Sequence, residues 1–104
     1  MSKKDNLREL VKLLTLSVAH KIGSIVNKDE LYAEKYLKES SHFLESAKEI
    51  YFKENWNSYD KQKIKDELKI MLNKELKKRD FIENKKFDLV DKEIEIALKY
   101  LESD

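Results

Sequence analysis

The chain has 104 residues, of which 41% are charged and 40% hydrophobic, and its net charge is +1. It contains no cysteine, which excludes disulfides, thiolate nucleophiles and cysteine-based zinc sites. It has no proline and one glycine, and therefore lacks the residues that β-rich folds use in turns. The composition predicts one all-α domain over residues 1–104.

No segment has the pattern of a signal peptide or of a membrane-spanning helix. The first ten residues, MSKKDNLREL, lack an apolar core, and no apolar run approaches the roughly 20 residues that cross a bilayer. We therefore expect a soluble, cytoplasmic protein without a membrane anchor. The high content of charged residues also fits a protein from a thermophile.

Apolar residues at three- and four-residue steps predict a first helix from about Asp5 to Val26. Asn27 is expected to cap the second helix, with Glu30 completing a capping box. The second helix then extends to the polar break at 54–55. The stripe on its predicted inner face consists of Leu37, Ser40, Leu44, Ala47 and Tyr51.

The third helix begins after a cap at Asn57 or Ser58 and is expected to end near Ile82. Asp88 is expected to cap a short fourth helix of about 14 residues. Short links between four amphipathic helices predict an antiparallel up-down-up-down four-helix bundle with a short fourth helix. The net charges of segments 2–27, 28–57, 58–87 and 88–104 are +3, −2, +4 and −4, so neighbours in a cyclic bundle would have opposite signs.

Ala19 and Gly23 lie four residues apart on one face of the first helix. Two small residues at this spacing let another helix approach closely, which would offset the roughly 1 kcal/mol that glycine costs inside a helix. We therefore predict a close helix crossing at this pair.

The neighbouring histidine raises a second possibility. His20 is followed by Lys21 at +1 and Gly23 at +3. The segment partly resembles the reactive helix of histidine phosphotransfer domains, four-helix bundles whose reactive histidine is followed by lysine at +3 and glycine at +4. The spacing here differs at both positions. Phosphotransfer is therefore kept as a less favoured alternative.

No metal, cofactor or catalytic group is expected. Glu39 and His42 have the E-x-x-H spacing of di-iron bundles, but the chain has no second such motif. A hairpin centred on Asn27 would place His20 opposite Glu34, about 12 Å along the axis from His42. The histidines would then not share an ion, and His42 would be partly buried beside its neighbouring phenylalanine. The serines next to His42 lack a third group that could orient a triad.

The third helix is rich in lysine, but acidic residues alternate with the lysines throughout it. Because binding to phosphates needs a sustained positive face, nucleic acid is a disfavoured partner and is kept as an alternative.

A group of aromatic residues around the second link is the favoured candidate site. The fourth helix would be about 21 Å long, whereas the other helices extend about 33 Å. One end of the bundle would therefore have only three helices. Aromatic side chains are ordinary core material as well as frequent anchors of protein interfaces, so either Trp56 folds inward and closes this end or a partner covers it. The predicted partner-binding residues at this end are Leu7, Val11, Tyr51, Phe52, Trp56 and Tyr59. The sequence thus favours a non-enzymatic module that binds another protein or associates with itself as a homo-oligomer.

Overall fold

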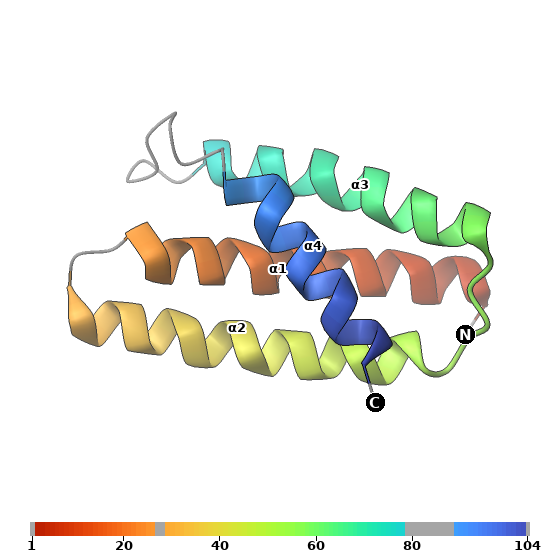
Figure 1. The fold of residues 1–104 in the computed structure, drawn as a ribbon, viewed down its shortest axis with the longest axis horizontal. Helices are drawn as coiled ribbons and strands as arrows, with labels where there is room; N and C mark the ends of the chain where they lie inside the picture. Colours follow the sequence, from red (N-terminus) through yellow and green to blue (C-terminus); the bar gives the residue numbers. More distant parts are fainter. Residues whose placement is uncertain (1, 27–28, 79–88, 104) are drawn as a thin grey trace.

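A computed structural model of the chain describes residues 2–26, 29–78 and 89–103, and these ranges form four α-helices (Figure 1). The helices are α1 (Lys3–Val26), α2 (Glu30–Tyr51), α3 (Ser58–Lys77) and α4 (Leu89–Glu102). The predicted all-α bundle of four helices with a short fourth helix is confirmed.

The cap predicted for the third helix is present at Asn57. Its side chain accepts a hydrogen bond from the Asp60 amide at 2.8 Å, and the Asp60 carboxylate accepts one from the Asn57 amide at 3.1 Å. The cap of α2 is Asp29 rather than Asn27, and it accepts from the amide two residues later at 3.0 Å. Asn27 lies outside the described residues, as do the predicted cap Asp88 and the predicted helix end Ile82.

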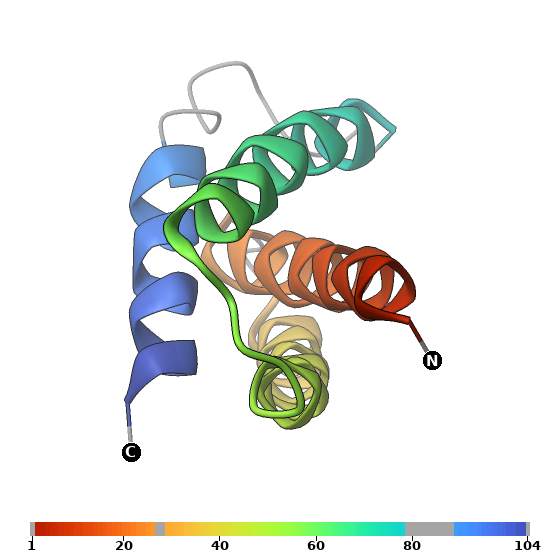
Figure 2. The same ribbon diagram turned by 90° about the vertical axis from the view of Figure 1, so that its right-hand side faces the viewer.

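α1 is the central helix of the bundle. Figure 2 shows it between α2 and α3, with α4 along one side of the group. Buried residues of α1 therefore cover most of its circumference, whereas those of α3 recur at four-residue steps on one stripe. This differs from the predicted cyclic order, because α2 and α3 lie on opposite sides of α1 instead of next to each other.

α4 runs in the direction opposite to α3, but its axis crosses the other helices obliquely (Figure 1). The alternating directions of α1, α2 and α3 agree with the predicted order, while the full up-down-up-down topology is not confirmed for the oblique fourth helix. The positive third and negative fourth segments do contact each other. Their ion pairs are Lys61–Glu102 at 3.4 Å, Lys65–Glu95 at 2.6 Å and Lys69–Asp91 at 3.1 Å.

A further charged pair lies beneath α4. The Lys21 Nζ atom of α1 is 2.8 Å from Oε2 of Glu93, and Glu93 is only 4% exposed. A buried carboxylate is costly unless it is paired, so this contact holds the inner face of α4 against α1.

α1 and α2 approach each other closely through small residues. The Ser17 hydroxyl donates to the Ser40 carbonyl oxygen at 2.8 Å, and the Ser40 hydroxyl donates to the Ser17 carbonyl oxygen at 2.7 Å. Nearer the link, Gly23 is buried against Tyr36, and Ala19 is fully buried. A Cβ atom added at Gly23 would lie 3.3 Å from Cδ2 of Tyr36, which is a tight contact.

We expect Gly23→Leu to lower the free energy of unfolding by about 1 to 3 kcal/mol, because its side chain would overpack the contact with Tyr36. Chemical denaturation followed by circular dichroism measures this change. Gly23→Ala is the matched control, since its gain of about 1 kcal/mol in helix propensity offsets mild crowding by one methyl group. A Gly23→Leu protein as stable as the wild type would show that this contact is not tight.

Candidate functional site

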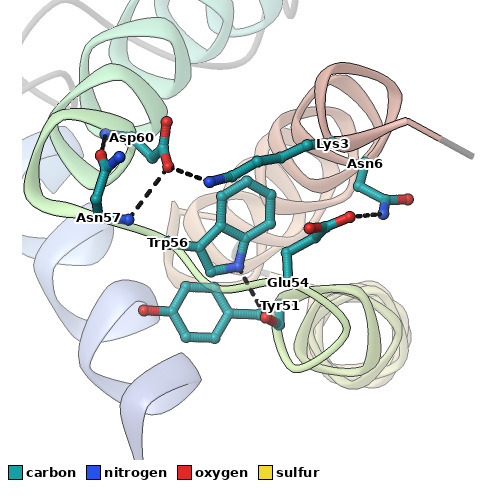
Figure 3. A network of polar contacts seen from close by, with 7 residues as sticks. All are labelled: Lys3, Asn6, Tyr51, Glu54, Trp56, Asn57 and Asp60. Atoms are coloured by element: carbon teal, nitrogen blue, oxygen red, sulfur yellow. Dashed lines mark hydrogen bonds and ion pairs between the residues drawn. The ribbon is translucent and has the colours of Figure 1, made fainter.

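Trp56 closes the end of the bundle at the link between α2 and α3 (Figure 3). Its indole N–H donates to the carbonyl oxygen of Tyr51 at 2.7 Å, and its ring stacks on that of Tyr51 at a centroid distance of 6.1 Å. Trp56 is half-buried and packs against the hydrophobic core. Within one copy of the chain, it is therefore primarily a structural residue.

Polar contacts connect the first turn of α1 with both ends of this link (Figure 3). The Lys3 ammonium lies 2.7 Å from Asp60 at the start of α3 and 5.7 Å from the centre of the Trp56 ring. The Asn6 amide donates to Glu54 at 2.8 Å. Three helix ends, from α1, α2 and α3, are thus held together around one indole ring.

The same contacts favour the charged form of Asp60. The hydrogen bond from Lys3 and, after it, the backbone hydrogen bond from Asn57 hold the pKa of Asp60 below its ordinary value. Their stabilising contribution is therefore present above the unfolded-state pKa and is lost as the pH falls through the folded-state pKa, below about pH 4.

The six residues predicted to bind a partner fall into three pairs by their exposure. Leu7 and Val11 are 8% and 1% exposed and belong to the core. Phe52 and Tyr59, by contrast, are 61% and 75% exposed. With Tyr51 and Trp56 half-buried, the aromatic surface that a partner can contact consists mainly of Phe52 and Tyr59.

Tyr51 is covered by α4, contrary to the expectation of an end with three helices. Its hydroxyl donates to Glu102 at 3.3 Å, and burial raises its pKa. α4 covers Tyr51 because of the position along α3 at which α4 begins. The first turn of α4 pairs with Lys69, two turns before α3 ends, so its 14 residues reach back to Lys61 in the first turn of α3.

A hollow of about 260 Å³ lies beside this end, between the first turn of α1 and the beginning of α3. It is lined by Lys3, Lys4, Leu7, Tyr59, Asp60 and Lys63. Leu7 and Tyr59 were predicted from the sequence as partner-binding residues, but the lysines were not. The sequence did contain a signal for the lysines. Helices one and three were predicted to run in the same direction, so the basic residues near the first turn of each helix lie at the same end of the bundle.

His20 is enclosed by its own chain. Its Nδ1 atom is 2.7 Å from the Leu16 carbonyl oxygen, and its Nε2 atom is 2.9 Å from a carboxylate oxygen of Glu39. A phosphoryl donor would have to displace Glu39 to reach Nε2. Glu39 instead of Glu34 lies opposite His20, so the centre of the hairpin lies near residues 29 and 30 instead of at 27.

The E-x-x-H pair does not converge on one point. Glu39 faces His20, while His42 is exposed instead of partly buried, although its ring lies 6.3 Å from that of Phe43 as predicted. Within the described ranges, no group of three or more histidine, aspartate or glutamate side chains is placed to hold a metal ion.

The lysines of α3 that face α4 are engaged by carboxylates. Lys61, Lys65 and Lys69 each pair with an acidic residue of α4, so they would have to leave these pairs to contact phosphates. The hydrogen bond to Glu95 raises the pKa of Lys65, which stabilises its charged form in this pair.

Comparisons of the chain with protein-family models, with curated proteins and with solved structures find no match. In the part of the chain that the structure describes, no helix combines the length and the apolar character needed to cross a bilayer. A function for this chain is therefore to be inferred from its own side-chain contacts.

Proposed function

We propose that this protein is a non-enzymatic interaction module that binds another protein, or a second copy of itself, through the end of the bundle around Trp56. The observation that carries the proposal is the exposure of Phe52 and Tyr59, which precede and follow this residue in the sequence. Aromatic side chains of this kind supply much of the binding energy in protein interfaces.

The surroundings of the two aromatics support a binding role. The polar contacts of Lys3, Asn6 and Asp60 hold the three helix ends in place, so a partner would meet a surface that is already ordered. Preorganisation of this kind lowers the entropic cost of association. The neighbouring hollow adds a concave surface beside Tyr59.

Other exposed apolar residues give weaker support for an interface. Leu31, Tyr32 and Leu37 are also exposed, at the start of α2. At 100° per residue these three side chains point in widely different directions around the helix, so they do not form one face. They serve instead as a control for exposed apolar surface in general.

The proposal predicts that Phe52→Ala/Tyr59→Ala weakens association by about tenfold or more, since each aromatic anchor contributes on the order of 1 kcal/mol or more. Light scattering at several concentrations measures self-association. Co-purification from the native host compares the partners retained by each variant. The matched control is Leu31→Ala/Tyr32→Ala, which removes similar exposed apolar area at the other end of α2.

A wild-type protein that is monomeric at every concentration, and whose partners are retained equally by both double variants, would contradict the proposal. Both variants replace exposed side chains, so their circular dichroism spectra should match the wild type.

A further inference from the structure

The hollow beside Tyr59 has more positive than negative charge. Three lysines and one aspartate line it, and Lys3 already pairs with that aspartate, Asp60, at 2.7 Å. Lys4 and Lys63 form no ion pair with any residue that the structure describes. Two cations from two different helices therefore flank one small concave surface, and the one carboxylate that lines it, Asp60, is already paired with Lys3.

The same hollow offers apolar contact. Leu7 lines it from α1, and the ring of Tyr59 lines it from α3, where this side chain is largely exposed. Its volume of about 260 Å³ is below the range of roughly 300 to 1,000 Å³ that is usual for small-molecule pockets. A site of this size and openness suits one or two side chains of a protein segment.

We propose that this hollow binds a segment of the partner protein in which one apolar side chain is flanked by carboxylates. This inference rests on the proposed function and names the chemistry of the partner. The apolar side chain contacts Leu7 and Tyr59, and the carboxylates pair with Lys4 and Lys63. Charge complementarity of this kind contributes mainly to specificity and to the rate of association.

The hollow fits an acidic protein segment better than a nucleic acid strand. Its positive surface is short and includes the carboxylate of Asp60, whereas a strand needs a groove that follows several phosphates. One aromatic ring, Tyr59, lines it, in place of the row of rings on which successive bases stack.

The test uses a dye-labelled, end-blocked peptide with one leucine between two pairs of glutamates, and fluorescence anisotropy measures its binding to the full chain. We expect saturable binding whose Kd rises with salt. Lys4→Glu/Lys63→Glu should raise the Kd about tenfold or more, because two attractive pairs become repulsive. Replacing the leucine of the peptide with alanine should also weaken binding, since it removes the apolar contact.

The matched control is Lys12→Glu/Lys74→Glu, which makes the same change of net charge on the same two helices, at exposed lysines outside the hollow. It should change the Kd by less than about twofold at physiological salt, where distant exposed charges are screened. Equal weakening by both double variants would show diffuse attraction and overturn the inference.

Two further outcomes would also overturn it. One is the absence of saturable binding of the peptide to the wild type. The other is tighter binding of a single-stranded oligonucleotide than of the peptide, with the same loss in Lys4→Glu/Lys63→Glu. If the peptide does not bind while Phe52→Ala/Tyr59→Ala still loses its native partner, the inference of an acidic partner segment is wrong and the proposed function stands.

Discussion

Trp56→Ala is expected to lower the free energy of unfolding by about 2 to 4 kcal/mol. Truncation of a tryptophan in a core costs about 3 to 5 kcal/mol, and the half-buried position of Trp56 reduces that figure. The variant also loses the hydrogen bond to the Tyr51 carbonyl and the stacking on the Tyr51 ring. Urea denaturation followed by far-ultraviolet circular dichroism measures the change.

Trp56→Phe separates packing from hydrogen bonding. It keeps an aromatic ring against Tyr51 but removes the N–H donor, so we expect a loss of about 1 kcal/mol. If Trp56→Ala were no less stable than Trp56→Phe, the ring would contribute nothing to the end of the bundle. Trp56 would then be available to a partner, which is one of the two alternatives that the sequence left open.

Lys21→Met is expected to lower the free energy of unfolding by about 2 to 4 kcal/mol, because it leaves the buried carboxylate of Glu93 without its cation. Removal of one partner from a buried pair typically costs about 3 to 5 kcal/mol. The estimate is lower here because one third of the Lys21 side chain is exposed.

The double variant Lys21→Met/Glu93→Leu tests whether the unpaired charge of Glu93 causes this loss of stability. It removes both charges and leaves apolar side chains of similar size, so most of the stability lost in Lys21→Met should return. A thermodynamic cycle with Glu93→Leu alone gives the coupling between the two residues. If the coupling energy were zero, the 2.8 Å contact would not hold α4 in place.

The helices could be predicted from the sequence because their signals are local. Apolar residues at helical spacing predicted all four, and Asn57 was one of the two residues predicted to cap the start of α3. The packing of the helices could not be predicted in the same way. The sequence did contain one signal that α1 is central: its apolar residues are spread over most of the circumference of the helix.

The pairing of α1 with α2 depended on the length of a link. The centre of the hairpin lies two to three residues later than predicted, so Glu39 instead of Glu34 lies opposite His20. Similarly, the coverage of Tyr51 depended on where α4 enters the bundle, which no residue pattern specifies.

The candidate site could be predicted in part, because aromatic residues cluster in the sequence around the second link. Composition does not reveal which of them remain exposed. Phe52 and Tyr59 are exposed, while Trp56 is half-buried because its N–H finds an acceptor inside the same chain. Lys4 and Lys63 were missed because they are far apart in sequence and approach only through the packing of α1 and α3.

The central position of α1 has a consequence for biosynthesis. α1 precedes the other helices in the chain, so the ribosome releases it before any of the helices that cover it. α3 is complete only at residue 77, about 50 residues after α1 ends, which corresponds to roughly 3 to 10 seconds at 5 to 20 residues per second. During this interval the side of α1 that later faces α3 lacks its native cover. A nascent chain stalled between α2 and α3 is therefore expected to bind chaperones that recognise apolar surface, and to release them once α3 has emerged.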